Sequence, residues 1–139
     1  PERALAEAGR LDDLQAKGQF KGPLHGVPFS MKDVFNTEGD IVTAGTLGLK
    51  NHVAKEDCVI AKRLKDAGGI LLGKTNTSEL EVAPDADNLV YGATSNPYNL
   101  SCSAGGSSGG SAAIVAACGS PFSIGADLGG SLRIPAHYC

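Results

Sequence analysis

The first segment of the chain carries apolar residues at helical spacing, at Leu5, Ala8, Leu11 and Leu14. Residues that recur every three or four positions share one face of a helix. The pattern therefore predicts an amphipathic opening helix whose role is packing. Glycine and proline at residues 18–23 predict a loop after it.

The period then changes from helical to alternating. Between residues 27 and 32, Val27, Phe29 and Met31 occupy every second position. Successive side chains of a strand point to opposite faces. A strand is therefore predicted here, with Ser30 and Lys32 together on one face.

A second helix and a second strand are expected further along. Asp57 can cap a helix that ends at residues 68–69, and residues 70–72 form a short buried strand. The apolar side of this helix is expected to carry Val59, Ile60 and Leu64. Helices that alternate with buried strands are typical of α/β architecture. Residues 92–99, which contain a proline, are expected to be loop or turn.

No Asp, Glu, Lys or Arg occurs between residues 88 and 126, which predicts that this stretch lies inside the protein. Within it, a glycine-serine segment at 105–110 leads into residues 111–117, which are apolar on nearly every side, as in a central helix. A strand over 121–126 and a second glycine-serine turn at 127–131 are expected next. Glycine in such loops allows tight bends and close approach to a ligand.

Composition limits the class of protein. The 139 residues, 42% hydrophobic and 19% charged, can bury the core of one globular domain. A net charge of -3 is not the basic excess that nucleic-acid binding requires. No apolar run approaches the roughly 18 residues of a membrane span. The four scattered cysteines form neither a metal-site nor a disulfide pattern, which favours reduced thiols and a cytoplasmic location.

Two short motifs suggest other functions. Gly68–Thr75 matches the phosphate-binding pattern GxxxxGK[ST], but a helix precedes it and the predicted strand falls inside it, the reverse of a phosphate loop. A nucleotide-binding protein using this segment stays an alternative from another class. Gly105–Gly109 also satisfies GxSxG, the nucleophile elbow of α/β-hydrolases, with Asp127 and His137 as later partners, although no preceding strand is evident.

A longer match covers residues 105–136, GGSSGGSAAIVAACGSPFSIGADLGGSLRIPA. This segment resembles the amidase signature family in its two glycine-serine loops, the small-residue helix between them and the closing SLRIP. Upstream, GPLHGVP with Lys32 and Asp33, GKTN at 73–76 and NPY at 96–98 resemble further blocks of the family. The resemblance extends from about residue 20 onward.

The resemblance implies a catalytic set for amide hydrolysis. Ser131 matches the nucleophile, Ser107 the bridging serine, which carries a cis peptide bond in the family, and Lys32 the base. The backbone amides of Leu128, Gly129 and Gly130, with that of Ser131, would form the oxyanion hole. A lysine accepts a proton only when neutral, so burial must lower its pKa.

Supporting residues are implied as well. Ser108 is expected to hydrogen-bond near the lysine, and Asp127 and Arg133 to form an ion pair beside the nucleophile. Neither a metal nor a cofactor is implied. His25 and His137 have no partners grouped with them that would form a metal site.

The implied fold is α/β, a mixed β-sheet sandwiched between α-helices. Residues 1–139 are expected to be the N-terminal to central part of a single amidase signature domain, truncated at both ends. The implied partner is a small-molecule amide, with no nucleic acid and no membrane segment, and a homodimer stays open. Leu128 and Ile134 favour a free-standing amidase, close to bacterial amidases and fatty-acid amide hydrolases. The alternative is an enzyme like the amidase-family subunit of the glutamyl-tRNA amidotransferase.

Overall fold

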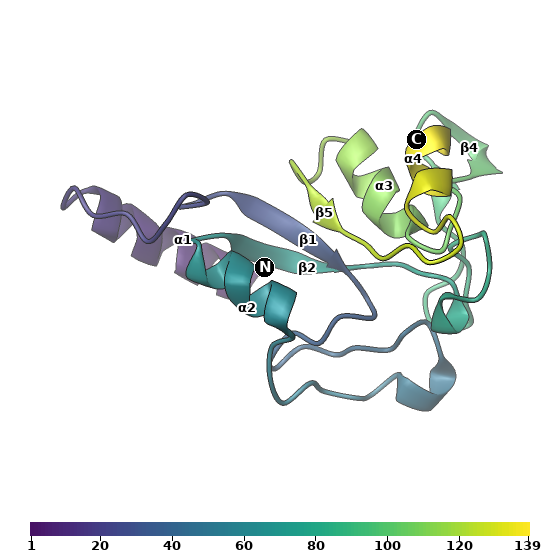
Figure 1. The fold of residues 1–139 in the computed structure, drawn as a ribbon, viewed down its shortest axis with the longest axis horizontal. Coiled ribbons are helices and arrows are strands. Elements are labelled where there is room, and N and C mark those ends of the chain that lie inside the picture. The colour runs from purple at the N-terminus through teal and green to yellow at the C-terminus, as the bar shows by residue number, and fades with distance from the viewer.

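A three-stranded parallel sheet forms the centre of the structure, a computed structural model that describes residues 1–139 (Figure 1). The strand order is β2-β1-β5, so β1 lies in the middle. These strands are β1 (Pro28–Lys32), β2 (Ile70–Thr75) and β5 (Ser123–Ile124). The helices are α1 (Glu2–Gln15), α2 (Val59–Asp66), α3 (Gly109–Ala116) and α4 (Arg133–Tyr138).

The central strand is buried on both faces because helices cover the sheet from two sides. Phe29 and Met31 are fully buried and pack with Ala61 of α2. The alternate residues Ser30 and Lys32 point the other way, toward α3. On that side Thr75, the neighbour of Lys32 on β2, shares a 2.6 Å hydrogen bond with Ser111 of α3. The expected α/β architecture is confirmed.

Two features of the sheet differ from the sequence prediction. The sheet within this chain is wholly parallel, and the antiparallel pairing occurs in a separate hairpin of β3 (Ser95–Asn96) and β4 (Asn99–Ser103). β3 falls in the segment predicted to be loop. The Asn96 side chain holds this hairpin, accepting from the Tyr98 amide at 2.9 Å and donating to the Tyr138 carbonyl at 2.8 Å. Two-residue strands carry no periodic signal.

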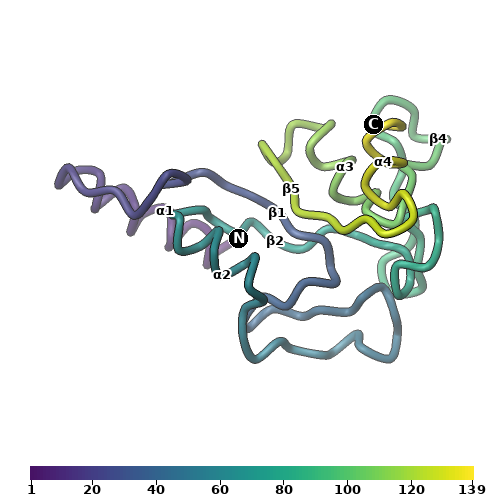
Figure 2. The backbone as a smooth tube through the Cα atoms, viewed as in Figure 1, coloured from purple at the N-terminus to yellow at the C-terminus, as the bar shows by residue number.

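The opening helix is confirmed, and it packs against β2 at the end of the molecule away from α4 (Figure 2). The second helix is also present, but its predicted cap is wrong. Cys58 is its N-cap, and the Asp57 carboxylate instead binds Lys65 at 2.7 Å and the Glu38 amide at 2.8 Å. Its buried residue is Ala61, whereas Val59 and Ile60 are exposed.

The prediction that the whole charge-free stretch is interior is wrong. Only residues 104–111 are continuously buried. Leu89, Tyr98 and Leu100 are each more than 70% exposed. No helix of the structure combines the length and the apolar character that crossing a bilayer requires.

Close backbone contact explains why α3 begins with glycine. A Cβ on Gly110 would overlap the backbone nitrogen of Asn76 and lie 2.7 Å from its carbonyl oxygen. The Gly110 amide donates to that carbonyl at 3.2 Å, which joins α3 to the end of β2. The helix can therefore approach the sheet only because this residue has no side chain.

Replacement of Gly110 by alanine should destabilise the protein. We expect Gly110→Ala to lower the free energy of unfolding of the full-length protein by about 1–3 kcal/mol, the usual cost of overpacking. Gly9→Ala is the matched control, because Gly9 lies inside α1 with nothing within 4 Å of an added Cβ. Chemical denaturation should show the control unchanged or stabilised by about 0.5–1 kcal/mol. Equal stabilities of the two variants would contradict the packing explanation.

Candidate active site

Lys32 is the last residue of β1, and its side chain is completely buried. Lysine is rarely buried unless its ammonium group is paired. Its Nζ lies 2.6 Å from the Oγ of Ser107 and 2.7 Å from a carboxylate oxygen of Glu81. The sheet thus brings together a lysine and a serine separated by 75 residues in the sequence.

Ser107 is positioned by the loop that connects β4 to α3. It is fully buried, and the Gly106–Ser107 peptide bond is cis, as the family resemblance implies. The next residue, Ser108, is the N-cap position of α3. The loop is therefore anchored on one side by the helix and directs the Ser107 hydroxyl at the end of β1.

Burial and charge act on Lys32 in opposite directions. Burial lowers the pKa of its ammonium group, because the charged form loses its hydration. The adjacent Glu81 carboxylate and the more distant Asp127 carboxylate raise it, and the loss of hydration outweighs them. A lysine with a lowered pKa is closer to the neutral form that can accept a proton.

Ser131 lies in the turn before α4, against the Ser107 loop. The Ser108 amide donates to the Ser131 carbonyl oxygen at 3.0 Å. The Ser131 side chain is half-buried, and no hydrogen bond joins its hydroxyl to Ser107 or Lys32. The structure therefore places two of the three predicted catalytic side chains in direct contact and brings the third to the same loop through its backbone.

Asp127 organises this turn. Its carboxylate accepts hydrogen bonds from the Gly130, Leu132 and Arg133 amides at 2.8–3.1 Å. It also forms the expected ion pair with the Arg133 guanidinium at 3.0 Å. The guanidinium, together with these amides, holds the pKa of the carboxyl well below its usual range. The carboxylate thereby fixes the backbone on both sides of Ser131.

The same turn leaves backbone donors free. The amides of Leu128, Gly129 and Ser131 have no acceptor within the protein, whereas the Gly130 amide is bound to Asp127. Gly130 has a φ of 118°, and a Cβ there would lie 2.8 Å from the Ile134 side chain. Adjacent free amides beside a serine are the donors that stabilise a tetrahedral oxyanion.

Comparison with known proteins gives the family of the chain. The family model described as Amidase matches residues 1–139. The chain belongs to the amidase signature family. It is 44% identical over 135 residues to a glutamyl-tRNA(Gln) amidotransferase subunit from Streptomyces coelicolor, covering 97% of this chain and 27% of that protein. It is also 44% identical over 137 residues to Amidase 1 of Gibberella moniliformis, covering 98% and 26%.

The fold of this amidase chain is also that of a solved relative. A structure of fatty acid amide hydrolase superposes with a TM-score of 0.94 at 34% identity, covering 99% of this chain and 24% of that one. The chain spans roughly a quarter of the length of the curated relatives it matches.

The structure gives Ser108 a specific hydrogen-bond partner and adds one residue, Glu81, to the site. The Ser108 hydroxyl, expected to hydrogen-bond near the lysine, donates to the Ala126 carbonyl at 3.2 Å and so ties α3 to the segment before Asp127. Glu81 was not singled out from the sequence. Glu81 lies 49 residues from Lys32, in a short turn without a periodic pattern. The only sequence signals for it are its charge and its position shortly after the GKTN block.

The phosphate-loop alternative does not fit the amidase fold. Residues 70–75 of the Gly68–Thr75 segment are strand β2, and no α-helix begins directly after Thr75, because the next α-helix, α3, starts only at Gly109. Phosphate binding requires a loop whose amides point at the ligand from a helix N-terminus. The Lys74 ammonium is bound to the carbonyl oxygen of Phe35 instead. The α/β-hydrolase alternative is also unsupported, because Asp127 binds Arg133 and not His137.

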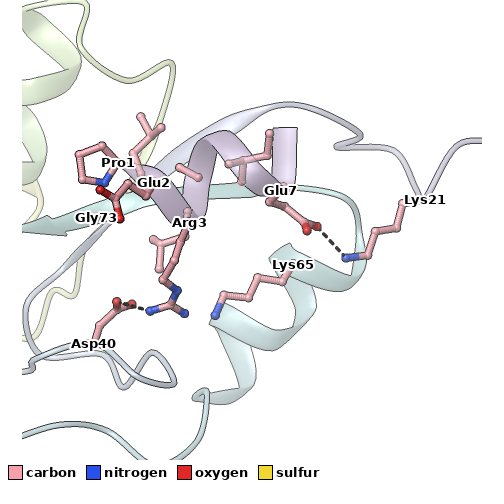
Figure 3. Close-up of a pocket in the computed structure, with 13 residues that line it drawn as sticks. Pro1, Glu2, Arg3, Glu7, Lys21, Asp40, Lys65 and Gly73 are labelled. Atoms are coloured by element: carbon pink, nitrogen blue, oxygen red, sulfur yellow. Dashed lines mark hydrogen bonds and ion pairs between the residues drawn. The ribbon is translucent and has the colours of Figure 1, made fainter. Parts of the chain in front are cut away.

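A cavity beside the N-terminal helix lies away from these residues. It has a volume of about 460 Å³ and is lined by the start of α1 and by β2 (Figure 3). Its basic side chains are already paired: Arg3 with Asp40 at 2.7 Å, Lys21 with Glu7 at 3.4 Å and Lys65 with Asp57 at 2.7 Å. None of Lys32, Ser107 and Ser131 lines it.

Loss of the Asp127 carboxylate should loosen the turn around Ser131. In the full-length protein, we expect Asp127→Ala to speed amide hydrogen exchange of Gly130, Leu132 and Arg133 by roughly tenfold or more, because these three backbone donors lose a charged acceptor. Exchange measured by mass spectrometry tests this. Asp87→Ala removes an exposed carboxylate that makes no hydrogen bond and should change nothing here. Unchanged exchange in Asp127→Ala would show that the turn does not depend on the carboxylate.

Proposed function

We propose that the protein hydrolyses a carboxamide through an acyl-enzyme, with Ser131 as nucleophile, Ser107 as proton relay and Lys32 as base. The observation that carries the proposal is the fully buried Lys32 Nζ at 2.6 Å from the Ser107 hydroxyl. A buried amine in contact with a serine beside a turn with free amides suits acyl transfer. Membership of a family of amidases supports the same chemistry.

In the proposed reaction, neutral Lys32 accepts the proton of Ser107, and Ser107 accepts the proton of Ser131. The Ser131 oxygen then forms a bond to the substrate carbonyl carbon. When the tetrahedral intermediate collapses, the carbon–nitrogen bond breaks and the relay returns a proton to the leaving nitrogen. Water, deprotonated by the same relay, finally hydrolyses the ester on Ser131.

The negative charge of the intermediate needs donors fixed in advance. The free amides of Leu128, Gly129 and Ser131 would supply them. Gly130 belongs to the proposed oxyanion hole chiefly through its conformation, since its own amide already donates to Asp127. Removing one such donor typically costs about 2.7–4 kcal/mol of transition-state stabilisation.

A second candidate is an enzyme like the amidase-family subunit of the glutamyl-tRNA(Gln) amidotransferase, favoured by the 44% identity to that protein from Streptomyces coelicolor. The chemistry on Ser131 would be the same, but glutamine would be the amide and a bound aminoacyl-tRNA the destination of the ammonia. A free-standing amidase stays first, because Leu128, fully exposed beside Ser131, presents an apolar surface at the turn.

Active-site labelling of the full-length protein tests the proposed nucleophile. We expect a fluorophosphonate to label the wild type and Ser131→Ala to abolish both the label and the hydrolysis of a simple aryl amide, assayed without ATP or Mg²⁺. Lys32→Ala and Ser107→Ala should lower kcat/KM by at least roughly 10³-fold, as is usual for members of one catalytic unit. The control is Ser101→Ala, whose exposed hydroxyl bonds only to Asn99.

Different outcomes separate the candidates. Label retained in Ser131→Ala would exclude Ser131 as the nucleophile. A protein that leaves aryl amides intact but releases ammonia from glutamine in the presence of ATP and a glutamyl-tRNA would favour the amidotransferase candidate. Absence of both activities together with absence of labelling would overturn the proposed function.

A further inference from the structure

The Lys32 ammonium contacts a second side chain besides Ser107, and the proposed reaction does not use this contact. The Glu81 carboxylate lies 2.7 Å from the same Nζ. The two partners differ in their environment, because the lysine side chain is 0% exposed while that of Glu81 is 33% exposed. Glu81 is therefore a charged group that contacts both the buried amine and solvent.

The backbone at Glu81 is unusual as well. Leu80 and Glu81 have φ values of 50° and 64°, in the left-handed region that residues other than glycine rarely adopt. This conformation is strained for a residue that has a side chain, and it persists only where the surroundings enforce it. Here the Leu80 amide donates to the Ala44 carbonyl at 2.8 Å, and the ion pair holds Glu81. The turn is thus fixed in a conformation that directs Glu81 at the site.

We propose that Glu81 is a positioning residue that sets the protonation state of Lys32: its carboxylate holds the resting ammonium and receives the proton that must leave before the lysine can act as a base. The inference rests on the proposed function, in which Lys32 is that base. The proton moves from Nζ to a Glu81 oxygen and from there to water, which leaves a neutral amine facing Ser107. No other reactant is required.

The direction of the effect follows from the charges around Nζ. A carboxylate at 2.7 Å stabilises the ammonium and delays its deprotonation as pH rises. Asp127 acts in the same direction from farther away, and its charge is shared with Arg133. Helix α3 and strand β5, which pack against β1, carry no titratable group. Lys74 on β2 neighbours Met31 and so lies on the other face of the sheet.

Neutralising Glu81 should therefore let Lys32 lose its proton at lower pH. In the full-length protein we expect Glu81→Gln to shift the acidic limb of the pH profile of kcat/KM for an aryl amide downward by roughly 1–3 pH units. This is the usual effect of an adjacent opposite charge on a pKa. Glu79→Gln, which neutralises an exposed carboxylate in the same turn, is the matched control and should leave the limb in place.

A measurement without turnover separates this inference from the proposed function. The Lys32 ε-carbon can be titrated by NMR in protein labelled with ¹³C at lysine, with Lys32→Met identifying the signal. We expect its midpoint to fall in Glu81→Gln by the same amount as the kinetic limb and to stay unchanged in Glu79→Gln. An unchanged midpoint in Glu81→Gln would overturn the role of Glu81, whether or not the protein is an active amidase. A shifted midpoint in a protein that neither labels nor turns over would support that role and reject the proposed function.

Discussion

The site depends on one buried contact, between the Lys32 amine and the Ser107 hydroxyl. An amine in this place would be unfavourable without partners, because burial removes its hydration. The sheet accepts it because the face of β1 toward α3 is polar, with Ser30 and Lys32 on it and the Thr75–Ser111 hydrogen bond beside them. The opposite face, with Phe29 and Met31, supplies the apolar core. One strand thus packs the apolar core on one side and carries the proposed base on the other.

The two glycine-serine loops contribute to the site in different ways. The first supplies Ser107 from a loop held at the start of α3, where Gly110 allows the helix to touch the end of β2. The second supplies Ser131 from a turn whose shape is set by the Asp127 carboxylate. The hydrogen bond from the Ser108 amide to the Ser131 carbonyl joins them. Loop positions are therefore defined by backbone contacts more than by side-chain packing.

Opposing electrostatic effects act on the protonation state of Lys32. Removal of water favours the neutral lysine, while Glu81 and Asp127 favour the ammonium. The balance matters for the proposed reaction, in which the same amine is stable in the folded protein and still releases a proton. The Asp127 carboxylate is already paired with Arg133 and with backbone amides. Glu81 is in direct contact with the Lys32 ammonium and is one-third exposed, so it is the group that can alter this balance.

Local pattern in the sequence determined the opening helix, the alternation that places Ser30 and Lys32 on one face, and the glycine-serine loops, because each is written in consecutive residues. Resemblance to a family, and not periodicity, singled out Lys32, Ser107 and Ser131. Only the tertiary structure decided the partners: Glu81 for Lys32, Lys65 for Asp57 and Ala126 for Ser108. The Lys32–Glu81 and Ser108–Ala126 partners lie 49 and 18 residues apart, and the Asp57–Lys65 pair joins the residue before the N-cap of α2 to its last turn. None of these arrangements has a local period. The same reason explains the missed hairpin at Asn96 and the exposure of Leu89 and Leu100, because absence of charge does not by itself specify what covers a residue.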